Sequence, residues 1–154
     1  MRLAWRSAKN TNTYDVFLLI NDDVVLNKNF WDDFIATDNY CIKKYNRSGI
    51  YSAATLDPKL NTVSYRGEKI TSRLFRVKSR RISPSGTPQS VDMVNANILW
   101  VDKSVVFDMG FLSEHFQHGL SDYDYGLRAN KHNIPILICG EYGGVCFNDH
   151  KKII

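Results

Sequence analysis

The sequence has no apolar run long enough to cross a membrane and no cysteine pattern typical of a metal site. Its longest apolar runs, 16–20 and 134–139, have the length of a β-strand, whereas a membrane helix needs about 20 apolar residues. Residues 1–10 contain basic side chains but no continuous apolar core, which argues against a secretory signal. Because the cysteines are odd in number, we expect reduced thiols in a cytoplasmic protein. These cysteines are Cys41, Cys139 and Cys146.

Glutamate is scarce as well, since only 3 Glu accompany 13 Asp. Aspartate is a poorer helix former than glutamate and is common at caps, turns and metal sites. The basic residues are unevenly spread: the segment 66–81 carries a net charge of +6, although the whole chain carries only +4. The remainder is therefore net acidic. A basic stretch beside Asp clusters indicates the handling of phosphates with a hard cation, while solvated loops would have the same composition.

The rest of the composition is that of an ordinary globular domain. With 154 residues, of which 44% are hydrophobic and 23% charged, the chain fits one domain that buries its own core. Neither an internal repeat nor a linker marks a second domain. We therefore expect a single domain over residues 1–154.

The hydrophobic pattern predicts strands that alternate with helices, which is typical of an α/β sheet. Residues 16–20 are apolar on both faces, so we expect them in the buried centre of a parallel sheet. Residues 67–90 are basic and then rich in Ser, Pro and Gly, which favours a long loop. The other expected elements are a helix end at 2–9; a helix capped by Asn27 or Asn29 that runs through Thr37 with Phe30, Phe34 and Ile35 inward; strands at 50–56, 62–66 and 91–101; a helix at 102–109 stopped by Gly110; a helix from Ser121 or Asp122 to about His132; and strands at 135–139 and 144–147.

Three polar groups could carry chemistry. Asn21-Asp22-Asp23 follows a buried strand directly, and ligands in open α/β sheets bind outside the carboxyl ends of strands. Carboxylates there can hold Mg²⁺ or Mn²⁺ together with substrate phosphates. A polar turn that leads into a helix cap is the simpler alternative.

The second group is Asp122 with Asp124, at the start of a predicted helix. A carboxylate held there could act as a general base on a hydroxyl, or it could simply cap the helix. The third is His150, after the last predicted strand; a lone histidine needs partners to bind a metal. Its position alone leaves a structural role open.

Taken together, these stretches resemble glycosyltransferases of family 2, which have the GT-A fold, and rhamnosyltransferase-like bacterial members in particular. Residues 14–35 resemble the apolar strand that runs into the Asp-x-Asp element holding the metal and the nucleotide diphosphate, together with the segment after it. Residues 91–112 resemble the acceptor-side strand and the turn after it, and residues 118–129 resemble the helix start that carries the catalytic base. His150 is in the position of a late histidine near the metal.

The resemblance implies a role for each matching residue. Asp23 and His150 would bind the metal, Mn²⁺ or Mg²⁺, with Asn21 in place of the first Asp of the motif. Asp122 would be the catalytic base, although Ser121 stands where many members have Glu. Asn95 and Asn97 flank Ala96, where members often have Gly. The residues implied to contact substrate are Asn21, Asp22, Asn95, Asn97 and Asp124.

The resemblance also implies a partial GT-A domain, a Rossmann-like mixed sheet flanked by helices. The family's nucleoside-recognition half has no counterpart before residue 1, so we expect the carboxyl part of a larger domain. Its partners would be a nucleotide-sugar donor and a saccharide or lipid-linked acceptor. We expect a cytoplasmic protein, with peripheral attachment at the inner face of the membrane and homo-oligomerisation as open alternatives.

Two other functions compete with inverting glycosyl transfer. One is a catalytically inactive, truncated remnant that serves as a binding or structural module. The other is nucleic-acid binding through 66–81, for which the sequence lacks a helix-turn-helix, an RNA-recognition motif or an aromatic platform. We therefore expect no nucleic-acid partner.

Overall fold

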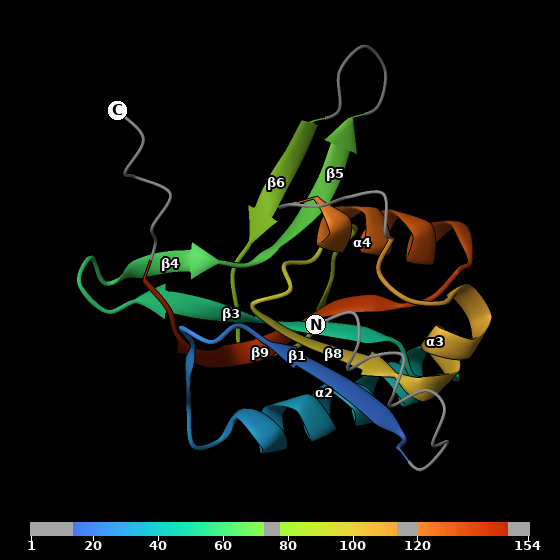
Figure 1. Ribbon diagram of the computed structural model, residues 1–154, viewed down its shortest axis with the longest axis horizontal. Helices are drawn as coiled ribbons and strands as arrows, with labels where there is room; N and C mark the ends of the chain where they lie inside the picture. The colour runs from blue at the N-terminus through green and yellow to red at the C-terminus, as the bar shows by residue number, and fades with distance from the viewer. Residues whose placement is uncertain (1–13, 73–77, 114–119, 148–154) are drawn as a thin grey trace.

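The computed structural model describes residues 14–72, 78–113 and 120–147. These residues form a mixed sheet with helices on both of its faces, and the predicted α/β class is confirmed (Figure 1). The strands are β1 (Val16–Ile20), β2 (Val25–Leu26), β3 (Ile50–Asp57), β4 (Thr62–Tyr65), β5 (Gly67–Ser72), β6 (Lys78–Ile82), β7 (Gln89–Ser90), β8 (Ile98–Asp102) and β9 (Ile136–Val145), and the helices are α2 (Phe30–Tyr45), α3 (Lys103–Met109) and α4 (Ser121–Lys131).

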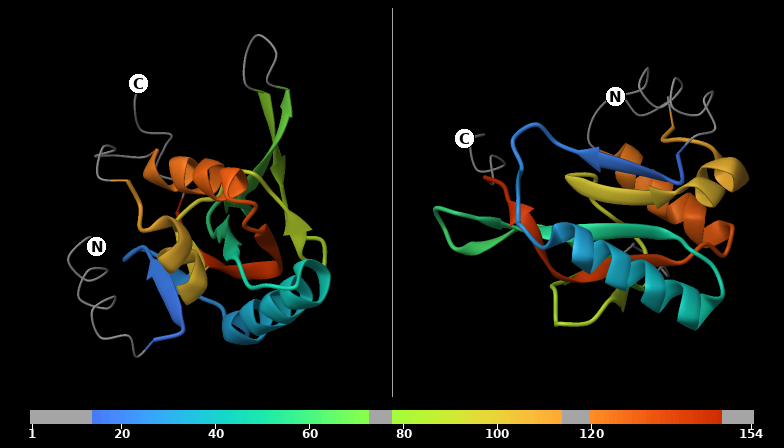
Figure 2. Two further views of the ribbon diagram at one scale, coloured as in Figure 1. Left: turned by 90° about the vertical axis from the view of Figure 1, so that its right-hand side faces the viewer. Right: turned by 90° about the horizontal axis from the view of Figure 1, so that it is seen from below.

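The main sheet has the strand order β1-β8-β3-β9-β2. β8 runs antiparallel to both of its neighbours, β1 and β3, whereas β3 and β9 are parallel. β4 folds back on β3, and β7 pairs with β9. β5 and β6 form a separate two-stranded sheet that projects from the body in Figures 1 and 2.

Alternating side chains of the sheet build a core on each face. Leu19, Leu99 and Ile138 belong to the core on the side of α3 and α4. Tyr51 and Trp100 belong to the core on the other face, with Phe34 of α2. Figure 2 shows α2 lying across that face of the sheet. The period-two alternation thus divides the buried residues into two layers, as expected for a sheet covered on both faces.

Helix α2 packs through a narrow stripe of buried residues, Phe34, Thr37 and Cys41. The Phe34 ring stacks on Trp100 with 5.4 Å between the centroids. The helix continues to Tyr45 and ends at Asn46 in the left-handed conformation, so the predicted end at Thr37 is wrong. The N-cap is Asn29, without a side-chain hydrogen bond, and Ile35 is 51% exposed instead of facing inward.

The prediction for β1 is half right. Its side chains point into both cores, as a continuously apolar strand should, but its neighbour β8 is antiparallel and β1 ends the strand order among the described residues. A strand with apolar side chains on both faces is one that helices cover on both faces. Its apolar pattern does not indicate whether the neighbouring strand is parallel or antiparallel. The expected helix at 2–9 lies outside the described residues.

The loop expected over 67–90 is confirmed only for the irregular residues 83–88, whereas 67–72 and 78–82 are the strands β5 and β6, which pair with Glu68 opposite Arg81 and Lys69 opposite Arg80. Residues 73–77 lie outside the described part of the chain. Charged side chains on both faces hide the alternation that normally identifies strands. The expected strand at 91–101 is also too long, since only Ile98–Asp102 is extended and paired as β8. The preceding residues instead form an irregular segment whose backbone binds Glu68 and Ile136.

The two terminal strands predicted around Gly140 to Gly143 are one strand, β9, with register shifts. The glycines do not end the strand. They allow the neighbouring backbone to approach closely, since a Cβ on Gly144 would lie 2.5 Å from the Val25 carbonyl oxygen. The predictions for the strands at 50–56 and 62–66 and for α3 are confirmed. Asp102 caps α3 by accepting from the Ser104 amide at 2.8 Å, and Gly110 ends it with a φ of 75°. None of the described helices is long and apolar enough to span a membrane.

Candidate functional site

Two of the predicted motifs meet at one end of the sheet because β1 and β8 are antiparallel. Ile20 is opposite Ile98, so the residues that follow β1 lie beside those that precede β8. The Asn21 backbone amide donates to the Asn97 carbonyl oxygen at 3.0 Å, and the Asn21 side-chain amide donates to Asn97 Oδ1 at 2.6 Å. Two residues that are 76 positions apart in the sequence are thereby held together.

Asn97 is the centre of this arrangement and is only 5% exposed. Its backbone amide donates to Asn95 Oδ1 at 2.9 Å, and its side-chain amide lies 3.4 Å from the Cys146 sulfur. The Cys146 thiol in turn lies 3.4 Å from Asp23 Oδ2. A continuous polar chain therefore links the end of β1, the start of β8 and the end of β9. We call Asn21, Asp23, Asn95, Asn97, Asp122 and Cys146 the edge cluster.

Cys146 was not predicted to belong to this site. It is 1% exposed and follows β9 just as Asn21 follows β1. Because the sequence predicts a strand over 144–147, it places Cys146 inside that strand, and only the end of β9 at Val145 puts Cys146 at the edge of the sheet.

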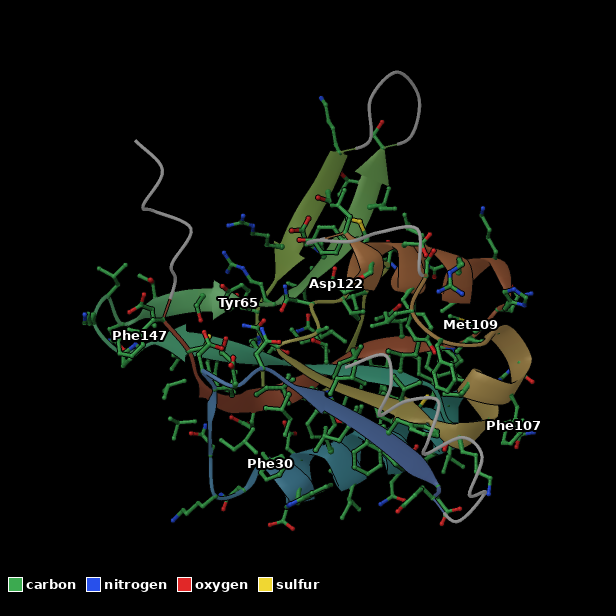
Figure 3. All side chains as sticks on the ribbon, in the orientation of Figure 1. Phe30, Tyr65, Phe107, Met109, Asp122 and Phe147 are labelled. Carbon is green, nitrogen blue, oxygen red and sulfur yellow. The ribbon has the colours of Figure 1, made fainter. Side chains whose placement is uncertain are left out.

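Asp122 joins the edge cluster from the first turn of α4 (Figure 3). Its carboxylate accepts from the Ala96 amide at 3.2 Å and from the Tyr123 amide at 2.9 Å. Burial raises the pKa of Asp122 above that of an ordinary aspartate, and the amide donors oppose this rise without cancelling it. The N-cap position is taken by Leu120 without a side-chain bond, so the prediction that Ser121 or Asp122 is the N-cap is wrong.

Asp124 points elsewhere. Its carboxylate binds Arg128 Nε at 2.8 Å, and the same guanidinium donates to the Met109 and Phe111 carbonyl oxygens at 3.2 Å and 2.7 Å. This ion pair therefore braces α4 against the end of α3. No hydrogen bond found among the described residues joins Asp124 to the edge cluster.

The predicted metal ligands are only partly described. Asp22 and Asp23 are exposed at the end of β1, and His150 lies outside the described residues. Within the described ranges, no group of three His, Cys, Asp or Glu side chains could hold a metal ion. A single carboxylate nevertheless fits Mg²⁺ or Mn²⁺ when substrate phosphates and water complete the oxygen shell. Asp23 is placed to be such a ligand, since one of its oxygens faces Cys146 and its side chain is open to solvent.

A separate open groove of about 690 Å³ lies between the start of α2 and β9. Asn27, Asp33 and Glu141 are among its lining residues, and none of the predicted site residues is. Burial, together with the nearby Glu141 charge, raises the pKa of Asp33, while hydrogen bonds from backbone amides oppose the rise. The groove is thus distinct from the edge cluster in its residues.

Comparisons with known proteins give information about the fold of the chain and not about its function. No protein-family model matches the chain, and no curated protein matches it. Among solved structures, the chain is similar to the crystal structure of A197 from STIV, with a TM-score of 0.55 and 10% sequence identity. The similarity covers 99% of this chain and 76% of A197. At this identity it shows a shared α/β fold, and fold by itself does not define an activity.

Proposed function

We propose that the chain is the metal- and acceptor-side part of a family 2 glycosyltransferase with a GT-A fold. It would transfer a sugar, with inversion, from a nucleotide-sugar to a hydroxyl of a saccharide or lipid-linked acceptor. One observation carries the proposal: three segments chosen for their resemblance to that family, 21–23, 95–97 and the start of α4, are joined by hydrogen bonds at one end of the sheet.

Asp122 is the group best suited to proton transfer. Two backbone amides orient its carboxylate, and burial brings the pKa of Asp122 closer to neutral pH than that of a solvated aspartate. A base whose pKa lies nearer the working pH takes a proton more effectively in the transition state. In the proposed reaction, Asp122 removes the proton of the acceptor hydroxyl as that oxygen attacks the anomeric carbon.

Asp23 would hold the divalent cation, with His150 as a further ligand implied by the resemblance. A bound Mg²⁺ or Mn²⁺ supplies positive charge that stabilises the departing nucleoside diphosphate. Asn97 would help to position Asp23 in two ways. Its side chain contacts the Cys146 thiol, which contacts Asp23, and it accepts a hydrogen bond from Asn21 at the end of β1.

The test is transfer by the longest natural protein that contains this chain. Asp122→Asn should lower the rate at saturating donor about 10²- to 10⁴-fold, the usual contribution of a general base. Asp108→Asn makes the same chemical change at an exposed surface pair with Arg47 and should keep the rate. An Asp122→Asn rate equal to that of the wild type excludes the base, and turnover undiminished by a chelator excludes the metal.

The alternative of an inactive remnant makes the opposite prediction for the isolated chain. Titration calorimetry with a nucleoside diphosphate and Mn²⁺ separates the two. Binding that Asp23→Asn abolishes supports a retained donor site, and absence of binding in both proteins supports a structural or binding module.

A further inference from the structure

The two-stranded sheet of β5 and β6 is the most strongly charged feature that the proposed function leaves unused. We define the basic hairpin as these two strands with their side chains Lys69, Lys78, Arg80 and Arg81. It projects from the body on the side of α4 (Figures 1 and 2). A positive protrusion of this kind can touch a surface that the rest of the protein does not reach.

The strand register places three of the four cations on one face. Lys69 is opposite Arg80, and Ser72 is opposite Lys78, which is two residues from Arg80. Residues directly opposite each other, and residues two apart on one strand, share a face of the sheet. The opposite face carries Arg81 and the single acid, Glu68, which also bonds the Ser79 hydroxyl.

The second face fixes the hairpin to the edge-cluster side of the molecule. Glu68 accepts from the Tyr123 hydroxyl at 3.2 Å, and its backbone pairs with Met93. Burial and the Glu68 charge raise the pKa of Tyr123 to about 12, so the phenol remains a donor at neutral pH. Tyr123 follows Asp122 directly. The basic face therefore keeps a set position relative to Asp122.

The positive charge on the open face is little neutralised. Asp92 pairs with Lys69 at 3.1 Å and accepts from the Ile70 amide at 2.7 Å. Lys78 and Arg80 are both exposed, and no ion pair involving either is found in the described parts of the chain. An exposed cation without a protein partner is available to an external anion.

We propose that the basic hairpin binds the anionic headgroups of a phospholipid bilayer and so holds the edge cluster close to the membrane surface. This surface goes beyond the proposed function, since it requires neither a donor nor an acceptor. Each Lys or Arg near an anionic leaflet strengthens binding about fivefold, and the attraction ends within a Debye length. The two cations without an ion pair among the described residues, Lys78 and Arg80, give weak, salt-sensitive, reversible attachment.

A bilayer fits the charge distribution better than a nucleic acid does. The chain outside 66–81 is net acidic, so a polyanion that follows the protein surface would meet repulsion, whereas a flat bilayer touches the protrusion alone. Large apolar side chains that are exposed, such as Trp31 and Phe107, do not lie on β5 or β6. The described hairpin therefore lacks the aromatic platform on which single-stranded bases stack.

The test is sedimentation of the chain with unilamellar vesicles. We expect binding to phosphatidylcholine vesicles that contain phosphatidylglycerol, none to pure phosphatidylcholine, and release as salt is raised. The double variant Lys78→Glu, Arg80→Glu should bind at least about 25-fold more weakly, from fivefold for each charge removed. The milder Lys78→Gln, Arg80→Gln should fall between this variant and the wild type.

The matched control is Lys43→Glu, Lys44→Glu, which changes the net charge equally at the exposed end of α2, on the other face of the sheet. It should keep most of the vesicle binding. Equal loss in both double variants, or no binding to anionic vesicles, overturns the proposal. So does tight binding of a single-stranded RNA or a DNA duplex, measured by fluorescence anisotropy, in a protein that ignores the vesicles. Glycosyl transfer is not measured in any arm, so these outcomes are independent of the proposed function.

Discussion

The Asn21 side-chain amide donates a hydrogen bond of 2.6 Å to the side-chain oxygen of Asn97, a residue 76 positions further along the chain. A second hydrogen bond joins their backbones. The residue that follows β1 therefore cannot move independently of the residue that precedes β8. Asp23 lies two residues beyond Asn21. The placement of Asp23, the candidate metal ligand, thus depends on the buried side-chain amide of Asn97.

Removing that amide should be costly. Asn97→Ala leaves the Asn21 amide without its acceptor and is expected to lower the free energy of unfolding by about 1–3 kcal/mol, the cost of an unsatisfied buried polar group. Urea denaturation measures it. Asn39→Ala, an exposed position on α2, is the control and should change stability by less than about 0.5 kcal/mol. Equal values for the two variants would contradict the role given to Asn97.

Gly126 sets how closely α4 approaches the segment before β8. A Cβ added there would lie 2.8 Å from the Asp92 carbonyl oxygen and 3.2 Å from Met93 Cα, both backbone atoms that cannot rotate away. Gly126→Ala should therefore destabilise by about 1–3 kcal/mol despite the better helix propensity of alanine. Thermal unfolding compared with Lys131→Ala, at an exposed position of the same helix, is the measurement. A more stable Gly126→Ala protein would show that α4 is free to move outward.

The raised pKa of Asp122 makes stability depend on pH. Because the folded-state pKa lies above the unfolded one, the folded protein takes up a proton first as the pH falls, and this residue's cost to stability disappears. Above the folded-state pKa, the full cost of burying the carboxylate is present. The stability of Asp122→Asn relative to the wild type should therefore be more favourable at pH 7 than near pH 3. A difference in melting temperature that stays constant between these values would contradict the shift.

The described thiols should be protected in the folded protein. Cys41, Cys139 and Cys146 are all buried, and burial raises the pKa of Cys41 and of Cys139. Both effects slow the reaction of thiols with disulfide reagents, since the thiolate is the nucleophile. A chromogenic disulfide should label none of the three within minutes in buffer and all three in denaturant. Rapid labelling of one thiol in buffer would show that its end of the sheet opens.

Part of the site could be predicted because its residues stand at the ends of predicted strands and helices. Asn21-Asp22-Asp23 stands after an apolar run, and Asp122 stands at a helix start, so each was recognisable locally. Their proximity in space could not be predicted from the sequence. It depends on the antiparallel pairing of β1 with β8, two strands that are far apart along the chain. Asn97 was expected to contact substrate, and only the three-dimensional arrangement shows that it is buried and bonded to Asn21.

The errors have the same physical origin. The charged strands β5 and β6 look like a loop because their alternation is not between polar and apolar side chains. β9 looks like two strands because its glycines, which normally weaken a strand, serve close approach. The side chain of Asp124 looks like a second site carboxylate, and its partner Arg128 is four residues away on the same helix. For the strands, neighbours far along the chain decided the outcome, and for Asp124 a neighbour on the next turn of its own helix did.

The parallel pairing of β3 with β9 also has a consequence for how the molecule forms. Ile50 is opposite Ile136, so the central pair of the sheet joins segments separated by most of the chain. The entropy of closing that long loop must be overcome before the pairing contributes any stability, which slows folding. During synthesis, β1, β8 and β3 can assemble while β9 is still absent. The polar chain through Cys146 can form only after β9 has joined the sheet, and until then the nascent protein exposes the edge of β3 that β9 later covers.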